Sequence, residues 1–432
     1  MTDTVSCTNV ANWWDGKVII DEIKIYADKR GMVSEVWRID SLMGMDSKQC
    51  YISETAPYIQ RGPHEHAAQS DFFVSWKNNM VYQMFNPETN EMKIFVTEKS
   101  KIYRIYVSIG IVHSYRNVDC EKSFTLNFPT SLFMGVDKKE PIDEIRHEDK
   151  HHHNDVIVVF GASGKLGKAI TSEFFAKMGE HTYDVIPSYE KLKNEQEVET
   201  FFKKLDLAIL PTQKVYFFNC ASLTNVQDVN TQEFIWEWSN VEMPVEFLKK
   251  CNSRNWQLIQ FSTDYVFQKV ENSIINYNLS SYTRSKIRME QALVNTKLDN
   301  YLVFRVANLF AENDNRNFIY KLTHALKKNG SIKVDPRIRI FPSNVVDVAA
   351  KIHELYKDGM YPVIKEDIFT SLVPSISFFL HEFVRVYLQV DPVLENGRIQ
   401  PWHPEFEKTV TYVFDANIIA MRDMISRYVK TD

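Results

Sequence analysis

The chain has 432 residues, of which 44% are hydrophobic and 25% are charged, a composition that excludes disordered and fibrous proteins and leaves room for two domains. Its formal net charge of −5 provides no broad basic surface, so nucleic acid is not expected as a partner. Neither an apolar run long enough to span a membrane nor a signal-peptide pattern is present, so we expect a cytoplasmic protein without a membrane partner.

Short segments rich in Val, Ile, Phe and Tyr, separated by Asn, Gly, Pro or Asp, occupy the first third of the chain. Such spacing is typical of an all-β sandwich or barrel. The expected strands cover residues 17–26, 71–76, 80–85, 92–96 and 102–107. We therefore predict an N-terminal all-β domain over residues 1–140.

A hydrophilic segment follows this domain. Residues 135–154 carry many charges and no apolar periodicity, so we place a linker at residues 141–154. Three consecutive histidines at residues 151–153 are interpreted as part of this solvated linker and not as a metal site.

From residue 155 onward, buried strands alternate with amphipathic helices. The string DVIVVF at residues 155–160 is a continuous apolar run, and similar runs lie at residues 215–219, 258–261 and 302–306. In the helix predicted after the first run, Leu166, Ile170 and Phe174 fall four residues apart. This alternation predicts a doubly wound α/β sheet of the Rossmann type over residues 155–432.

A glycine-rich string, GASGKLG at residues 161–167, joins the first of these strands to its helix. Gly161 permits a tight turn, Gly164 lets the backbone approach a pyrophosphate, and Gly167 allows the helix to pack closely on the strand. The helix N-terminus adds amide donors and a partial positive charge. The spacing resembles that of extended short-chain dehydrogenases/reductases, which implies a nicotinamide cofactor at this loop. The other loop residues expected at the cofactor are Ser163, Lys165 and Leu166.

The choice of nicotinamide cofactor depends on the next predicted strand. Asp184 lies inside this strand, Ser188, which is also expected to bind the cofactor, lies near its tip, and Lys191 and Lys193 follow. NAD-selective sites commonly carry an acidic residue there. We therefore favour NADPH and leave NADH as the alternative.

Tyr282 and Lys286 stand four residues apart at the start of a predicted helix, so both point to one face. Ketone reduction needs a proton for the developing alkoxide, and tyrosine alone is a poor acid because its pKa is about 10. A nearby lysine ammonium lowers that pKa and can also hold the nicotinamide ribose. The pattern predicts catalysis by Tyr282 and Lys286, with Thr263, at the end of the preceding strand, donating a hydrogen bond to the carbonyl oxygen.

Four strings make the resemblance of this half more specific. NCASLTNV at residues 219–226, STDYVF at 262–267, YTRSK at 282–286 and RVANLF at 305–310 resemble the dTDP-4-dehydrorhamnose reductase family. The similarity covers about residues 155–432. It implies a 4-ketoreductase of a nucleotide-linked sugar, with Asn219 and Ala221 at the cofactor. It also implies that Asp264 and Asn308 bind the sugar.

The N-terminal domain contains two informative strings, IQRGPHEHAAQSDFF at residues 59–73 and YVSIGIVHSYRN at residues 106–117. RGPH resembles the RGLH of the dTDP-4-dehydrorhamnose 3,5-epimerase family, which has a cupin jelly-roll fold, and the similarity covers about residues 17–147. The resemblance implies that His64 is a base that removes the proton next to a 4-keto group. It further implies that Arg61, His66 and His113 bind the substrate.

Two positions depart from the epimerase family. Phe133 stands where the family has its tyrosine acid, and Asp71 stands where the family has a lysine. We therefore favour inversion at carbon 3 alone over inversion at carbons 3 and 5. Tyr115, Tyr106 or water would then supply the second proton.

A metal site is the rival interpretation of the same histidines. His64, His66, Asp71 and His113 also fit the ligand segments of metal-binding cupins. The residue four positions after the second histidine is normally glutamate in those proteins, and here it is Ser70. We therefore favour a catalytic base without a metal, and a purely structural histidine cluster is the third interpretation.

Together the two resemblances predict a bifunctional enzyme, and similar two-domain fusions are associated with giant-virus sugar pathways. It would epimerise a nucleoside-diphosphate 4-keto-6-deoxy sugar and then reduce its 4-ketone. UDP and dTDP stay open, as do a rhamnose-type sugar and a UDP-2-acetamido-2,6-dideoxy sugar. The cupin resemblance also implies a homodimer.

Two alternative hypotheses give the chain one catalytic activity or none. In one, the reductase carries a non-catalytic cupin that serves for dimerisation. In the other, the chain is a non-catalytic NADP-binding regulatory subunit, similar to that of methionine adenosyltransferase. The intact set of Thr263, Tyr282 and Lys286 argues against the second alternative.

Overall fold

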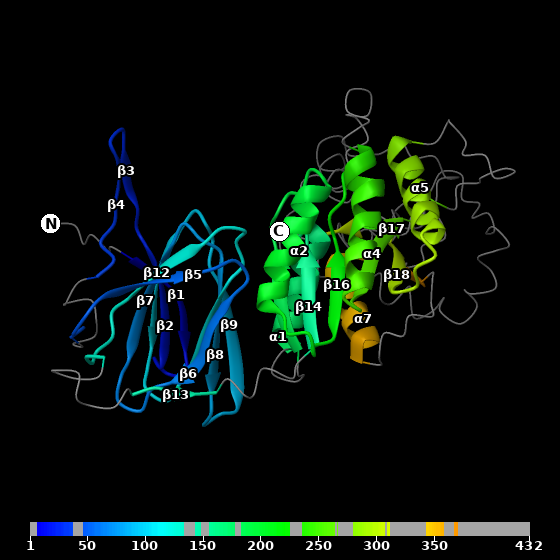
Figure 1. The fold of residues 1–432 in the computed structure, drawn as a ribbon. Helices are drawn as coiled ribbons and strands as arrows, with labels where there is room; N and C mark the ends of the chain where they lie inside the picture. The colour runs from blue at the N-terminus through cyan, green and yellow to red at the C-terminus, as the bar shows by residue number, and fades with distance from the viewer. Residues whose placement is uncertain are drawn as a thin grey trace, which may run out of the picture. The chain divides into compact units, whose positions relative to one another are not determined.

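The structure is a computed structural model that describes residues 7–37, 46–133, 143–147, 155–177, 183–224, 236–263, 266, 280–306, 309–311, 343–357 and 367–369. Within these ranges the N-terminal part forms antiparallel sheets, and the C-terminal part forms a parallel sheet with helices (Figure 1). The predicted fold class is therefore confirmed. No helix in the described ranges is long and apolar enough to cross a membrane.

Two antiparallel sheets build the N-terminal part, with strand orders β1-β2-β10-β7-β12-β5 and β13-β6-β11-β8-β9. The first consists of β1 (Cys7–Trp13), β2 (Val18–Ile23), β5 (Tyr51–Thr55), β7 (Asp71–Trp76), β10 (Ile102–Val107) and β12 (Ser123–Asn127). The second consists of β6 (Gln60–Glu65), β8 (Met80–Asn86), β9 (Glu91–Val96), β11 (Val112–Asn117) and β13 (Ile145–Arg146). A separate pair is formed by β3 (Tyr26–Asp28) and β4 (Gly31–Val33).

One apolar core joins the two antiparallel sheets. It contains Ile20 and Phe73 from the first sheet and Tyr82 and Tyr115 from the second. The ring of Phe73 lies 6.1 Å from that of Tyr82 and 5.5 Å from that of Tyr115, measured between centroids. Residues that alternate along each strand supply this core, which is why the strands were visible as short runs of Val, Ile, Phe and Tyr. The two sheets form the predicted cupin fold.

Part of the segment expected to be a linker is built into the second sheet. β13 pairs antiparallel with β6, so that Arg146 lies opposite His64. The amide of His147 donates a hydrogen bond to the carbonyl oxygen of Pro63 over 3.0 Å. Both residues of β13 are exposed, and the strand lies at the sheet edge. An edge strand with exposed side chains needs no apolar alternation, so its charged sequence did not indicate a strand.

The C-terminal part contains a six-stranded sheet in the order β15-β14-β16-β17-β18-β21. Its strands are β14 (Asp155–Phe160), β15 (Tyr183–Ser188), β16 (Val215–Asn219), β17 (Gln257–Thr263), β18 (Tyr301–Val306) and β21 (Asp367–Phe369). β19 (Leu309–Phe310) and β20 (Ser343–Asn344) form a short parallel pair. The continuous apolar runs of the sequence correspond to four of these strands, β14, β16, β17 and β18, as expected for a sheet that helices cover.

The helices of this part are α1 (Lys165–Lys177), α2 (Glu195–Ala208), α4 (Met243–Ser253), α5 (Ser281–Asn295), α7 (Val345–Lys357) and the π-helical turn η5 (Trp238–Glu242). Phe201 of α2 packs on Phe160 of β14 at 5.5 Å between ring centroids, and Phe247 of α4 packs on Phe217 of β16 at 5.0 Å. Because β15 and β16 lie on opposite sides of β14, the strand order reverses there. Dinucleotides bind at such a switch point, beside the carboxyl ends of the strands.

Candidate active sites

Three histidines and one aspartate meet between the two antiparallel sheets. His64 on β6 lies opposite His113 on β11, while His66 directly follows β6. Asp71 begins β7 of the other sheet. Ligand-type atoms of the four side chains all lie within 4.8 Å of one another. These four residues are referred to below as the histidine cluster, which brings together three residues predicted for the sugar site.

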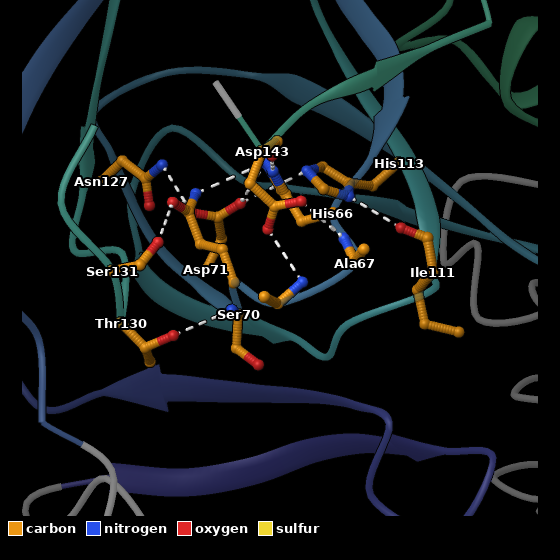
Figure 2. A network of polar contacts seen from close by, with 12 residues as sticks. His66, Ala67, Ser70, Asp71, Ile111, His113, Asn127, Thr130, Ser131 and Asp143 are labelled. Atoms are coloured by element: carbon orange, nitrogen blue, oxygen red, sulfur yellow. Dashed lines mark hydrogen bonds and ion pairs between the residues drawn. The ribbon is translucent and has the colours of Figure 1, made fainter. Parts of the chain in front are cut away.

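Asp71 lies beside His66 and His113 of the histidine cluster (Figure 2). Its Oδ2 atom is 3.3 Å from Nε2 of His66 and 3.6 Å from Nε2 of His113. Its Oδ1 atom accepts hydrogen bonds from Nε2 of Gln69 and from Nδ2 of Asn127, each over 3.0 Å. The side chain is 1% exposed, so these donors replace the water that a buried carboxylate has lost.

Asp143 is a site residue to which no sequence pattern pointed, because it lies in the charged segment expected to be a linker. Its backbone carbonyl oxygen contacts Nδ1 of His66. Its carboxylate accepts hydrogen bonds from the backbone amides of Ala67 and Ala68 over 3.0 and 2.8 Å (Figure 2). Asp143 therefore holds both the ring of His66 and the backbone that follows it.

The pKa values of the histidine cluster diverge. Burial, together with the neighbouring His113 and His66, lowers the pKa of His64 to about 3, and only Asp71 acts strongly in the opposite direction. Burial also lowers the pKa of His113. Burial acts in the same direction on His66, but the hydrogen bond and charge of Asp71 outweigh it, so the pKa of His66 is raised. His64 is thus neutral, the form that can accept a proton.

Gly62 allows β6 and β11 to approach each other beside the histidine cluster. Its φ angle is +78°, a region that glycine adopts without steric cost. A Cβ atom at this position would lie 2.6 Å from the carbonyl oxygen of His113. The glycine of the RGPH string therefore sets the distance between the strands that carry His64 and His113.

Arg61, predicted to bind the substrate, is exposed and is directed to β5. Its Nε atom donates to Oγ1 of Thr55 over 3.2 Å, and its Nη2 atom donates to the carbonyl oxygen of Glu54 over 2.8 Å. The structure thus shows Arg61 linking β6 to β5, and its contact with substrate stays a prediction.

The residues considered as proton donors lie in different surroundings. Tyr115 is buried two residues after His113 on β11. The hydroxyl of Tyr106 lies 3.4 Å from Oγ of Ser70. Phe133, which stands where the family has its tyrosine, is 54% exposed. Both tyrosines therefore remain structural candidates, and burial raises the pKa of Tyr115, which keeps its hydroxyl protonated.

The glycine loop joins β14 to α1 at the switch point of the parallel sheet. Gly161 has a φ angle of +78°, and its amide donates to the carbonyl oxygen of Ser188 over 3.1 Å. α1 begins at Lys165, and the amide of Lys168 donates to the carbonyl oxygen of Gly164 over 2.8 Å. The amides of the first helical turn have no partner within the helix, so this loop fits the pyrophosphate of a dinucleotide.

The other residues predicted at the cofactor occupy the positions expected from the strand pattern. Ser163 is exposed in the loop, whereas Leu166 and Gly167 are buried in α1. Asn219 ends β16, where its Nδ2 atom donates to Oε1 of Gln260 over 2.8 Å. The backbone amide of Ala221 donates to Oδ1 of Asn219 over 3.2 Å. This contact orders the loop that follows β16.

α5 presents Tyr282 and Lys286 side by side, and the side chain of Ser280 caps its N-terminus. Nζ of Lys286 lies 5.9 Å from the ring centroid of Tyr282 and donates to the carbonyl oxygen of Phe261 over 3.0 Å. This hydrogen bond anchors α5 on β17, the strand that ends in Thr263. Asp264 and Asn308, the predicted sugar-binding residues, lie outside the residues that the structure describes.

Asn240 and Glu290 hold α5 in place. Asn240 lies in η5, and its Nδ2 atom donates to Oγ of Ser285 over 3.1 Å. Glu290 accepts from Oγ of Ser262 over 2.5 Å and from Nε of Arg305 over 3.0 Å. Glu290 was not predicted from the sequence, although its spacing four residues after the lysine of the catalytic pair was an available signal.

Glu290 also influences the charge of Lys286. Burial lowers the pKa of Lys286 to about 8, and the negative charge of Glu290 opposes this effect. The lysine therefore changes its charge state close to physiological pH, whereas an ordinary lysine does so near pH 10.4.

The C-terminal part thus combines a Rossmann-type sheet with a glycine loop and the Tyr282/Lys286 pair, and the N-terminal sheets form a cupin sandwich. Residues 155–369 match the family model described as the RmlD substrate binding domain. The dTDP-4-dehydrorhamnose reductase of Mycolicibacterium smegmatis is 26% identical over 213 residues, which cover 48% of this chain and 62% of that protein. The chain thus spans about three fifths of the length of this relative.

The N-terminal part has its own relative. The "Probable low-salt glycan biosynthesis epimerase Agl13" of Haloferax volcanii is 28% identical over 134 residues, which cover 29% of this chain and 84% of that protein.

Among solved structures, an NADP complex of dTDP-4-dehydrorhamnose reductase from Bacillus anthracis is 18% identical to this chain. It covers 65% of this chain and 99% of its own, and has a TM-score of 0.47. The predicted resemblance of the two halves to a reductase and to an epimerase is confirmed.

Proposed function

We propose that the chain is a bifunctional enzyme of nucleotide-sugar biosynthesis. It epimerises a nucleoside-diphosphate 4-keto-6-deoxy sugar at carbon 3 and then reduces the 4-ketone with NADPH. The observation that carries this proposal is the placement of Tyr282 and Lys286 on one helix that is anchored to β17. We further propose a homodimer whose epimerase domain covers residues 1–140 together with β13, and whose reductase domain covers residues 155–432.

In the reductase half, a bound NADPH would supply hydride to carbon 4 of the sugar. Tyr282 donates the proton that the developing alkoxide needs, and the Lys286 ammonium favours the tyrosinate that results. Thr263 donates a hydrogen bond to the same oxygen. The residues proposed to hold the cofactor are Gly161, Ser163, Gly164, Lys165, Leu166, Gly167, Ser188, Asn219, Ala221, Tyr282 and Lys286, and Asp264 and Asn308 are proposed to hold the sugar.

In the epimerase half, His64 removes the proton from carbon 3, which the neighbouring 4-keto group makes acidic. The charge of Asp71 stabilises the imidazolium that forms. Arg61, His66 and His113 are proposed to hold the sugar. Because Phe133 has no hydroxyl group, the enolate is reprotonated by a tyrosine of the sandwich or by water, and inversion is confined to carbon 3.

We expect His64→Gln to lower the exchange of the carbon 3 proton by about 10²- to 10⁴-fold, the range that removal of a positioned base gives. The measurement is deuterium uptake from ²H₂O by UDP- and dTDP-linked 4-keto-6-deoxy sugars without NADPH, followed by NMR. His147→Gln is the matched control, because His147 pairs with Glu65 outside the histidine cluster. Absence of deuterium uptake with every 4-keto sugar would refute the epimerase half.

We expect kcat/KM of the reduction to fall above about pH 8. Burial lowers the pKa of Lys286 to about 8, so the ammonium is present below that pH and is lost as the pH rises through it. Glu290→Gln removes a charge that raises this pKa, so the alkaline limb should move to lower pH. The measurement is the pH profile of NADPH oxidation, with the exposed Glu195→Gln as control. An unchanged alkaline limb in E290Q would contradict the role of Glu290.

A further inference from the structure

Two imidazoles of the histidine cluster direct their Nε2 atoms at the same carboxylate oxygen. Nδ1 of His113 lies 2.9 Å from the carbonyl oxygen of Ile111, and Nδ1 of His66 contacts that of Asp143. A carbonyl oxygen only accepts hydrogen bonds, so Nδ1 carries a proton in both rings, and Nε2 carries a lone pair whenever the ring is neutral. Both Nε2 atoms face Oδ2 of Asp71, at 3.3 and 3.6 Å. When both rings are neutral, these two nitrogen atoms and the carboxylate oxygen are all hydrogen-bond acceptors. A positive charge between them would stabilise the arrangement.

Nε2 of His66 lies 3.4 Å from Nε2 of Gln69, whereas Nε2 of His113 faces only Asp71 within the described part of the chain. His113 is 3% exposed, and its Nε2 atom has no hydrogen-bond partner among the residues described. Gln69 and Asn127 both donate to Oδ1 of Asp71 and leave Oδ2 directed at the histidines. A buried polar atom without a partner is costly, and such atoms commonly mark a missing ion or water.

We propose that His66, Asp71 and His113 bind a divalent transition-metal cation, with Zn²⁺ as the best match to two imidazoles and one carboxylate. Tetrahedral zinc with bonds of about 2.0–2.1 Å requires ligand atoms roughly 3.4 Å apart. The two nitrogen–oxygen distances of 3.3 and 3.6 Å agree with this spacing. The ligand atoms of the two histidines lie within 4.8 Å of each other, close enough for a small inward movement to complete the site.

The contacts around the three ligands are those that orient metal ligands. Each ligating histidine donates its other ring N–H to a backbone carbonyl, and the carboxylate accepts hydrogen bonds from two amides. No hydrogen bond holds the ring of His64 within the described ranges, so this residue is assigned to proton transfer and not to the cation.

This inference rests on the proposed epimerase function and deepens it. Two histidines and one carboxylate leave a coordination position open to a substrate. The 4-keto oxygen of the sugar would occupy that position, so that His66 and His113 hold the sugar through the cation. The carbon 3 proton passes to His64, and the electron pair of the broken C–H bond forms the enolate, whose negative oxygen faces the cation.

The test is metal binding by the full chain after removal of metals with a chelator. Histidines 151–153 offer a competing site, so all variants carry His151→Ala, His152→Ala and His153→Ala. We expect one Zn²⁺ per chain by calorimetry, and Co²⁺ should show the visible absorption of a four-coordinate site. Asp71→Asn should lower the affinity by more than about 100-fold. Equal binding by the parent and by Asp71→Asn would overturn the proposal.

Two further variants keep the test informative if Asp71→Asn does not fold, and test whether His64 is a ligand of the cation. Asn127→Leu removes one donor to the Asp71 carboxylate and should lower the affinity by about 10-fold or more, even if Asp71→Asn does not fold. His64→Gln should keep the affinity within about threefold. A loss in His64→Gln as large as that in Asp71→Asn would overturn the assignment of His64 as a free base.

Deuterium exchange separates this proposal from the epimerase function. Exchange at carbon 3 that continues at full rate in metal-free protein would overturn the catalytic cation and leave the epimerase intact. Tight Zn²⁺ binding without any exchange would support the metal site and rule out the epimerase. Exchange that is lost on chelation and restored by Zn²⁺ would support both.

Discussion

Tyr282→Phe is expected to lower kcat of the NADPH-dependent reduction by about 10²- to 10⁴-fold, the range that loss of a positioned acid gives. The substitution removes only the hydroxyl group. The ring keeps its edge contact with Trp236 at 6.3 Å between centroids, and Lys286 keeps its hydrogen bond to Phe261. KM for NADPH should change far less than kcat, because Lys286 and the glycine loop, which are also proposed to hold the cofactor, are untouched. The measurement is the absorbance of NADPH with a 4-keto nucleotide sugar.

Tyr183→Phe is the matched control for this experiment. Tyr183 on β15 is buried, and its hydroxyl donates to the carbonyl oxygen of Phe174 over 2.8 Å. Its loss should lower the melting temperature and leave kcat close to that of the parent. If Tyr282→Phe kept more than a tenth of kcat, the pair would not be the catalytic one. A parent protein that binds NADPH and oxidises none would favour the regulatory-subunit alternative.

Gly62→Ala is expected to lower the free energy of unfolding of the N-terminal part by about 2–5 kcal/mol. A residue with a Cβ atom at positive φ costs about 1–3 kcal/mol, and forcing an extra carbon into a packed site costs about as much again. The φ angle of +78° and the 2.6 Å approach to the carbonyl oxygen of His113 combine both penalties. Urea denaturation gives the free energy of unfolding, and deuterium exchange should fall in parallel because β6 and β11 move apart.

Gly110→Ala separates the two penalties in this prediction. Gly110 has a similar φ angle of +72°, but a Cβ atom there would meet nothing within 4 Å. Its substitution should therefore cost only the backbone strain. Equal destabilisation by the two substitutions would show that the close approach of β6 to β11 contributes nothing.

Much of the fold could be predicted because burial leaves a direct pattern in the sequence. The run at residues 155–160 is buried on both faces of a parallel sheet and became β14 with the predicted bounds. β13 could not be predicted, because its two residues are exposed and its backbone pairs at a sheet edge. Hydrogen bonds between backbone groups do not depend on which side chains the strand carries. Strand pairing of this kind therefore cannot be predicted from residue types and is found only in the structure.

The two sites differ in how far the sequence could reveal them. Tyr282 and Lys286 are brought together by one helical turn, so their spacing alone predicts the contact. His64 and His113 meet through strand pairing, and Asp71 joins them from the other sheet. Their side-chain chemistry suggested a site, but which atoms face one another depends on strand register and on the carbonyl groups that orient each ring.

The position of Asp143 bears on how the two halves of the chain can be divided. A fragment that ends at residue 140 would keep every histidine of the cluster, yet it would lose β13 and the carbonyl group that orients His66. A fragment that ends after His147 would retain both. The N-terminal sheets therefore include residues later in the chain than composition suggests, because Asp143 and β13 contact the strand that carries His64 and the residue that follows it.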